Sequence, residues 1–369
     1  MRSVIKYFIA VLSCAFSLAG YAQVSQDSMK IIYDEVKTPY KYGLVMVPEN
    51  DSQKLDCPTV FRKGNIWYMT YLTFGGRGYE TWLAKSSDLL HWQKMGRQLS
   101  FSNDSTIWDA NQKAGYNALT NTSWGGNYEL QKYTGKYWMS YFGGNQTGYE
   151  AGLLSIGMAY TKEDPAIAHE WQRLDHPVLS SNDKDVSWWE NKKQFKSSVI
   201  WDKQQLSGYP FVMYYNANGD TAKDNKKTRW FERIGMAVSN DMINWKRIQT
   251  EPLVHHPVGI TGDPVFQKIG KLWVMFYFGA FWEDRKGAFN RFACSYDLQH
   301  WTDWTGDNLV ESTEPFEDLY AHKSFVIKYK GVVYHYYCAV NKKDQRGIAV
   351  ATSKDLGKSK LSFVKKESK

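Results

Sequence analysis

A fivefold internal repeat constrains the fold of this chain more than any other feature of its sequence. Each copy has a glycine, two further residues and then an aromatic residue that opens a β-rich run. The copies begin at Gly64, Gly135, Gly208, Gly270 and Gly331, so successive glycines lie 71, 73, 62 and 61 residues apart. Such self-similarity is the signature of a repeat architecture, in which each copy is one supersecondary unit.

Each copy also carries further strand-like segments in a constant order. A short apolar run precedes the glycine, for example at residues 58–61 and 324–327, and a run rich in small residues follows the aromatic strand. The fifth copy ends without a fourth strand, and we expect the N-terminal segment near Val45 to supply it and close a ring. Three copies continue into a Ser-x-Asp-x3-Trp sequence, which ends at Trp92, Trp245 and Trp301.

Four short strands repeated five times predict an all-β protein, a five-bladed β-propeller with four antiparallel strands per blade. Propeller blades pack face to face, so each sheet is buried on both sides and its strands are apolar rather than strictly alternating. The 59 aromatic residues, 16% of the chain, are therefore expected to belong mainly to the core between blades. We expect the blades near residues 45–98, 120–175, 190–250, 260–305 and 318–356.

The first 22 residues have the features of a secretory signal peptide. Arg2 and Lys6 form the positive region, an apolar stretch follows, and small residues at 20 and 22 give a cleavage site before Gln23. Cys14 leaves a lipoprotein anchor open. We expect residues 23–369 to form a single propeller domain that is exported, to the periplasm or outside the cell, and has no membrane span.

Charge and cysteine content limit the class of function. Without Arg2 and Lys6 the chain has 44 basic and 38 acidic residues, a net charge of +6. This charge fits a solvated basic surface or attraction to an acidic polysaccharide, and no motif suggests nucleic acid. The three cysteines after the leader have neither an even count nor metal-ligand spacing, so we expect buried thiols and neither metal nor cofactor: Cys57, Cys294 and Cys338.

The residues that begin the innermost strands of a propeller meet at one end of its axis. Structural strands do not need ionisable residues there, because burying unpaired charge is costly. An aspartate close to a proline also caps turns, so Asp56 and Asp263 are open to a purely structural role. Counting about eight residues back from each glycine gives the expected site residues: Asp56, Asn127 with Glu129 nearby, Lys196, Asp263, and the pair His322 and Lys323.

Loops on the same face add polar and aromatic side chains. We expect Arg77, Arg346, Trp124 and Trp189 to contact a ligand there. Indole faces stack on the C–H groups of a pyranose, and planar polar side chains bond its hydroxyls. Glu190 follows Trp189, and apolar surroundings favour the protonated carboxyl that a general acid needs, so Glu190 is a second candidate acid.

These features resemble the five-bladed propeller superfamily of glycoside hydrolases, which includes families 32, 43, 68, 117 and 130. The resemblance covers the whole mature chain and rests on the blade pattern, the Ser-x-Asp-x3-Trp runs and Asp56 ahead of a proline in blade one. It implies that Asp56 is the general base of an inverting enzyme or the nucleophile of a retaining one. Family 43 has acidic residues on blades three and four, where this chain has Lys196 and Asp263. Family 117 uses a histidine as proton donor, a role that His322 would match.

The first hypothesis is therefore an exported glycoside hydrolase, exo-acting and inverting, that cleaves an oligo- or polysaccharide of plant or algal origin, neutral or anionic. Asp56 would activate water, and Asp263 or His322 would protonate the leaving oxygen or tune the acid. The alternatives are a carbohydrate-binding propeller without catalysis, and a lyase or phosphorylase on the same scaffold. In each case the sugar would be held by Lys196, Lys323 and Arg346.

Overall fold

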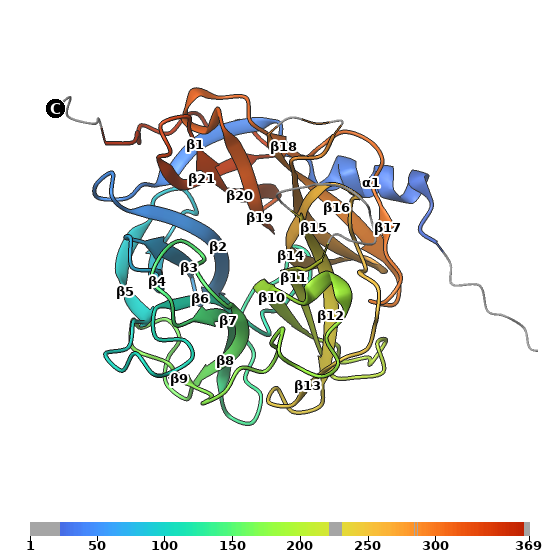
Figure 1. Ribbon diagram of the computed structural model, residues 1–369. Coiled ribbons are helices and arrows are strands. Elements are labelled where there is room, and N and C mark those ends of the chain that lie inside the picture. Colours follow the sequence, from blue (N-terminus) through green and yellow to red (C-terminus); the bar gives the residue numbers. More distant parts are fainter. Residues whose placement is uncertain (1–22, 221–230, 284, 286, 365–369) are drawn as a thin grey trace, which may run out of the picture.

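The chain folds as a ring of β-sheets, antiparallel within each run of strands, around a central axis (Figure 1). The computed structural model describes residues 23–220, 231–283, 285 and 287–364, so the expected signal peptide and Cys14 lie outside the described residues. Within those ranges no helix is both long and apolar enough to cross a bilayer.

Three of the sheets have four strands each. The first contains β2 (Lys54–Lys63), β3 (Ile66–Phe74), β4 (Tyr79–Ser86) and β5 (Gln93–Leu99). The second contains β6 (Gln112–Asn117), β7 (Tyr137–Gly144), β8 (Ser155–Thr161) and β9 (Gln172–Arg173). The third combines β1 (Tyr40–Met46) with β21 (Arg346–Thr352), β20 (Val332–Val340) and β19 (Tyr320–Tyr329).

The fourth sheet has nine strands in two antiparallel runs. One run is β10 (Lys193–Trp201), β11 (Phe211–Asn218), β12 (Phe231–Ser239) and β13 (Trp245–Arg247). The other is β14 (Gly259–Ile269), β15 (Leu272–Ala280) and β16 (Ala288–Ser295), with the short β17 (Thr302–Asp303) and β18 (Val310–Glu311). A parallel pairing of Phe231 with Gly259 and Glu232 with Ile260 joins the two runs. The all-β prediction is confirmed, and hydrogen bonding divides the strands into four sheets.

The N-terminal strand closes the ring, as the sequence predicts. Strand β1 pairs antiparallel with β21, which places Tyr40 opposite Thr352 and Met46 opposite Ile348. The two ends of the domain therefore share one sheet.

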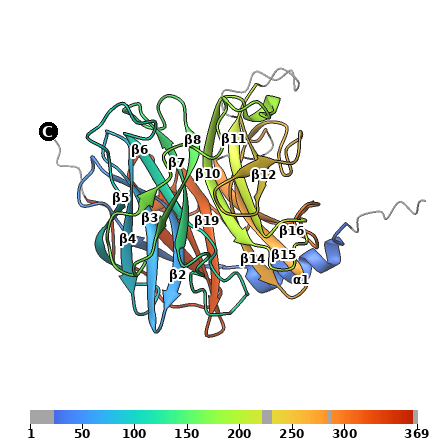
Figure 2. The ribbon, with the colours of Figure 1, turned by 90° about the horizontal axis from the view of Figure 1, so that it is seen from below.

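Helix α1 (Gln26–Val36) lies outside the ring beside β16 and β17 (Figures 1 and 2). Ser25 caps it, because Ser25 Oγ accepts a hydrogen bond from the Ser28 backbone N–H at 3.2 Å. The apolar face of the helix buries Met29, Ile32 and Val36 in a cluster with residues of β14, β15, β16 and β19. The helix therefore covers an apolar surface shared by the third and fourth sheets.

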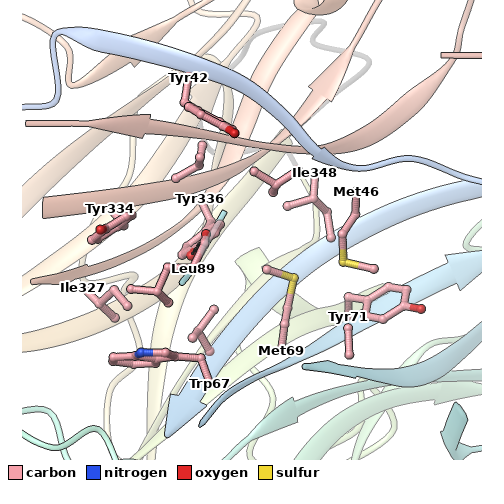
Figure 3. Packing of buried hydrophobic residues seen from close by; sticks show 14 of the residues in the cluster. Tyr42, Met46, Trp67, Met69, Tyr71, Leu89, Ile327, Tyr334, Tyr336 and Ile348 are labelled. Carbon is pink, nitrogen blue, oxygen red and sulfur yellow. Dashed lines mark hydrogen bonds between the residues drawn. The ribbon is translucent and has the colours of Figure 1, made fainter. Parts of the chain in front are cut away.

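Large apolar side chains fill the interfaces between sheets. In the cluster of Figure 3, Trp67 and Met69 of β3 meet Tyr336 of β20 and Ile348 of β21, and all four are fully buried. Burial of apolar surface stabilises a fold by roughly 25 cal/mol per Å². Cys57, Cys294 and Cys338 are buried free thiols, as expected. The aromatic excess of the sequence is thus largely core.

The three Ser-x-Asp-x3-Trp sequences form one recurring turn. In the first, Ser86 Oγ accepts from the Leu89 N–H at 2.9 Å and Asp88 Oδ1 accepts from the His91 N–H at 2.8 Å. The Trp92 indole N–H then donates to the Leu89 carbonyl at 3.3 Å. The serine and aspartate bonds recur in the turns that follow Ser239 and Ser295. The motif therefore fixes the connection between third and fourth strands and is not a ligand site.

Candidate active site

Four inner strands share an irregularity that decides which side chains face the axis. The pairing of β2, β10, β14 and β19 with the next strand shifts register at the same relative position. Three of the bulged residues, Cys57, Asp263 and Lys323, have φ values of +45°, +55° and +63°. A bulge re-aims side chains, and such a backbone conformation in a non-glycine residue is typical of functional sites.

These bulges open into one pocket of about 230 Å³. One part of its wall is apolar and includes Phe142, Phe195 and Phe278. The volume is below the roughly 300–1,000 Å³ of ordinary small-molecule sites, so the pocket fits a small ligand unit. Its polar and ionisable lining residues are Glu150, Lys196, Asn216, Glu232, Asp263, His322, Lys323 and Arg346.

Asp56 lies behind this pocket, so the prediction that it lines the pocket is wrong. On β2 the first bulged residue is Cys57, whereas the equivalent positions on β14 and β19 hold Asp263 and Lys323. Asp56 is one residue earlier, and its side chain is fully buried between the first and third sheets. His322 holds the equivalent position on β19 and does reach the pocket, so the pairing of Asp56 with Lys323 and Arg346, rather than its place before the bulge, accounts for its burial behind the cavity.

The Asp56 carboxylate is held by two cations. Its Oδ2 accepts from Lys323 Nζ at 3.0 Å and from Arg346 Nη1 at 2.5 Å, and the Tyr79 hydroxyl donates to it at 3.2 Å. Burial alone would raise the pKa of Asp56, but the charges of Lys323 and Arg346 outweigh burial and hold the pKa well below its usual range. A fully buried carboxylate of such low basicity is better suited to orienting Lys323 and Arg346 than to activating water.

Asp263 and His322 do line the pocket, as predicted. Asp263 Oδ2 lies 3.5 Å from Cys57 Sγ, and its backbone N–H donates to Asn216 Oδ1 at 3.4 Å. Burial, and then the positive charge of Lys323, lowers the pKa of His322 to about 3. His322 is therefore neutral at physiological pH, a state that does not suit the general-acid role considered for it.

Two glutamates that the sequence analysis did not select, Glu150 and Glu232, add carboxyl groups to the pocket. Burial raises the pKa of Glu150, although the Lys323 ammonium opposes the shift. For Glu232, burial and then the negative charge of Glu150 raise the pKa to about 8. Asn216 Nδ2 donates to Glu232 Oε2 at 2.5 Å and fixes its orientation. Glu232 is thus protonated near neutral pH, as a general acid must be.

Counting back from the repeat glycines misses both glutamates because that procedure finds inner strands alone. Glu150 lies in the connection between β7 and β8, and Glu232 lies near the start of β12. One signal was available for Glu150: Gly148 and Gly152 flank it and both have positive φ, so the segment is a tight turn.

The loop that carries Glu150 is tied to its surroundings. Gln112 Nε2 donates to the Gly148 carbonyl at 2.5 Å, and Lys193 Nζ donates to the Glu150 carbonyl at 2.7 Å. The Arg77 carbonyl accepts from the Gly148 N–H at 2.9 Å, while the Arg77 guanidinium donates to Asn111 Oδ1 at 2.7 Å. Arg77 was predicted to contact a ligand, but it is not among the residues that line the pocket. Its bonds support the loop that carries Glu150.

Lys196, Lys323 and Arg346 line the pocket, as predicted. Lys323 and Arg346 both form ion pairs with Asp56. The surroundings of Lys196 are different. Lys196 is 1% exposed, its Nζ lies 5.4 Å from the centre of the Tyr116 ring, and no hydrogen-bond partner for it occurs in the described part of the chain. An unpaired buried ammonium is costly, so Lys196 points to a ligand that supplies oxygen acceptors.

Glu190 and Trp189 belong to the core, which corrects two further predictions. Glu190 is fully buried, and its Oε2 accepts from Arg247 Nε at 2.8 Å and from the Tyr215 hydroxyl at 2.6 Å. Glu190 is thus held by Arg247 and Tyr215 away from the residues that line the pocket. Trp189 is 1% exposed, and its ring packs against Gly235 and Tyr215.

Asn127 and Trp124 also lie outside the pocket. The inner strand of the second sheet is β6, which begins at Gln112, ahead of the expected boundary near residue 120. Counting back from Gly135 therefore falls within the long β6–β7 connection. There Trp124 Nε1 donates to Glu35 of α1 at 2.7 Å, and Asn127 bonds Asn121 and the exposed Glu129. No group of three or more metal-binding side chains occurs among the described residues.

Comparison with solved structures identifies relatives with the same fold. A structure described as a complex of BT0996 with RGII is 52% identical, with a TM-score of 0.89, over 94% of this chain and 100% of that one. A "Glycoside hydrolase" is 51% identical, again with a TM-score of 0.89, over 94% of this chain and 100% of that one. A thermostable family-43 glycoside hydrolase is 15% identical, with a TM-score of 0.55, over 85% and 95% of the two chains, and shares the fold alone.

Neither a scan of family models nor a search of curated proteins gives a match. The 51% sequence identity to a solved glycoside hydrolase, over 100% of that chain, nevertheless shows the class of enzyme. The chain therefore belongs to the glycoside hydrolases with a propeller fold, and the prediction of an enzyme of this class is confirmed.

Proposed function

We propose that the protein removes one terminal sugar from an oligosaccharide, with Glu232 as general acid and Glu150 as the second catalytic carboxylate. One observation carries this proposal: two glutamates with raised pKa values line a single small pocket. Glycoside hydrolysis needs one protonated and one ionised carboxyl group on either side of the scissile bond. A pocket of about 230 Å³ supports exo-cleavage, because it fits one sugar ring better than a longer saccharide.

In the proposed reaction Glu232 protonates the glycosidic oxygen. Burial, with the negative charge of Asp56, raises the pKa of Glu150, and the positive charges of Lys323 and Arg346 oppose this rise and so favour its ionised form. Glu150 then activates water, which is the inverting mechanism of the first hypothesis drawn from the sequence. Proton NMR of the first anomer released tests inversion, and a retained configuration would make Glu150 a nucleophile instead.

The proposed substrate is an RGII oligosaccharide, since a structure 52% identical to this chain is described as a complex with RGII. We propose that the terminal sugar is neutral. Asp56 pairs with both Lys323 and Arg346 and offsets one of their two positive charges. Lys196 is the third pocket cation among the described residues, and three carboxyl groups, those of Asp263, Glu150 and Glu232, share the pocket with these cations. This balance favours hydroxyl recognition over binding of the anionic sugar considered from the sequence.

The experiment is incubation of the purified protein with RGII oligosaccharides and mass spectrometry of the products. Glu232→Gln and Glu150→Gln should each lower kcat by about 10²- to 10⁴-fold, because general acid–base groups contribute that much. Glu163→Gln, an exposed glutamate near the end of β8, is the matched control. Full activity in both variants would overturn the assignment. Binding without turnover would favour a carbohydrate-binding propeller, and an unsaturated or phosphorylated product would favour a lyase or phosphorylase.

We further propose five blades and export. The nine-stranded sheet is interpreted as two blades bridged by the short β12–β14 pairing, with the inner strands β2, β6, β10, β14 and β19 about the centre of the ring in Figure 1. Export rests on the leader-like residues 1–22. N-terminal sequencing of the protein from fractionated cells tests it, and an intact N-terminus in the cytoplasm would refute it.

A further inference from the structure

Exposed aromatic side chains stand at the mouth of the pocket. Tyr149 is 44% exposed and Phe281 is 38% exposed, yet both line the cavity. Tyr320 lines it as well. A single exposed apolar side chain is ordinary, but several aromatic side chains at the edge of a polar cavity are typical of a binding site.

Phe281 and Tyr320 form one side of this mouth. Their ring centres lie 5.9 Å apart with planes at 82°, and the Tyr320 ring lies 5.8 Å from the ring of His322. Phe281 follows β15 with φ +59°, a conformation that bulky residues rarely adopt. The backbone N–H of Phe281 donates to the Gly287 carbonyl at 3.3 Å, so a turn holds this conformation. The ring is more than a third exposed and therefore presents apolar surface at the mouth of the pocket.

Tyr149 stands on the loop next to Glu150 and is rigidly held. Its ring lies 5.5 Å from that of Phe74 and 5.8 Å from that of Tyr79. Its hydroxyl oxygen accepts a hydrogen bond from Arg346 Nη1 at 3.1 Å. A ring fixed by three contacts presents its surface at little cost in side-chain entropy.

We propose that Phe281 and Tyr320, with Tyr149, form the subsite for the leaving group, which is the second sugar of the oligosaccharide. This inference rests on the proposed function, in which the terminal sugar occupies the cavity beside Glu150 and Glu232. The exposed rings stand at the solvent end of the same cavity, so they contact the part of the substrate that departs. The C–H face of a sugar ring stacks on an aromatic ring, whereas hydroxyls at its edge stay in water.

Two substrates that release the same sugar separate this subsite from the catalytic pocket. One is the RGII oligosaccharide, and the other is the glycosyl fluoride of the sugar released from it, which has no second ring. Phe281→Ala should lower kcat/KM for the oligosaccharide about tenfold, the loss of one aromatic stack, and leave kcat/KM for the fluoride unchanged. Phe281→Trp should restore the oligosaccharide rate. Alanine keeps a Cβ, so the backbone strain is the same in the variant.

Tyr296→Ala is the matched control, since Tyr296 is 42% exposed in the turn directly after β16 and does not line the pocket. Equal loss on both substrates, or no loss on either, would overturn the subsite. A thermal unfolding curve of Phe281→Ala that matches wild type excludes a folding defect. If wild type releases sugar from neither substrate, the proposed function fails. Calorimetry with the oligosaccharide then decides the subsite, because Phe281→Ala must still weaken binding if the subsite exists.

Discussion

At the scale of single residues, Asp56 shows how one carboxylate can hold two pocket side chains without lining the pocket itself. It is the shared partner of Lys323 and Arg346, two cations that line the pocket from β19 and β21. The sequence marked Asp56 correctly as an unusual inner-strand acid. It could not show that the side chain pairs with Lys323 and Arg346 behind the pocket, because these partners come from the opposite end of the chain.

Asp56→Asn tests this role. Removing the charge leaves two buried cations unpaired, so we expect a loss of about 3–5 kcal/mol in the free energy of unfolding. The pKa of Asp56 is depressed in the folded state, so its stabilising contribution is complete above its unfolded pKa of about 3.9 and disappears as the pH falls below that value. Tyr79→Phe, which removes one hydrogen bond to the same oxygen, should cost about 1 kcal/mol.

Denaturant unfolding at pH 7 and at lower pH measures both variants. If Asp56→Asn were as stable as Tyr79→Phe at neutral pH, Asp56 would not be the counter-ion that holds the two cations.

The raised pKa of Glu232 predicts a pH profile. kcat/KM should fall as the pH rises through about 8, because Glu232 then loses the proton that it must donate. The hydrogen bond from Asn216 lowers this pKa, so Asn216→Ala should move the alkaline limb to higher pH. Because the folded state retains a proton that the unfolded state loses above about pH 4.3, Glu232 also makes stability decrease from there up to about pH 8. Initial rates measured over about five pH units, from pH 5 to pH 10, give the position of the alkaline limb of kcat/KM. An alkaline limb that stays in place in Asn216→Ala would show that another group sets it.

At the scale of elements, the repeat predicted strands well and connections poorly. The Ser-x-Asp-x3-Trp turns are held by local hydrogen bonds, so they can be predicted from the sequence. The pairing of β1 with β21 can be predicted by counting the strands of each copy. Strand β6 breaks the repeat because residues 118–136 separate it from β7, and the predicted positions of Asn127 and Trp124 were wrong for that reason. Glu150 and Glu232 lie in or beside connections, whose course depends on neighbouring sheets rather than on local pattern.

Helix α1 offers a matched pair of neighbours for measuring its contribution. Ile32 is 5% exposed and packs in the cluster beneath the helix, whereas Ile31 is 70% exposed. Ile32→Ala should lower the free energy of unfolding by about 2–4 kcal/mol, because it opens a cavity, and Ile31→Ala should leave it within about 0.5 kcal/mol. Thermal or denaturant unfolding measures both variants. Equal effects would mean that the helix does not stabilise the ring.

At the scale of the whole molecule, β1 pairs with β21, and β21 begins at Arg346. Arg346 reaches the pocket from the last strand of the ring and bonds Asp56 in β2, near the beginning of the domain. The strand pairing that joins the two ends of the domain therefore also brings Arg346 to Asp56. A polypeptide still being synthesised lacks both the closing strand pair and the cation that pairs with Asp56. We therefore expect the proposed activity to appear only after the last strand has paired, so the connectivity of the ring would set when catalysis begins.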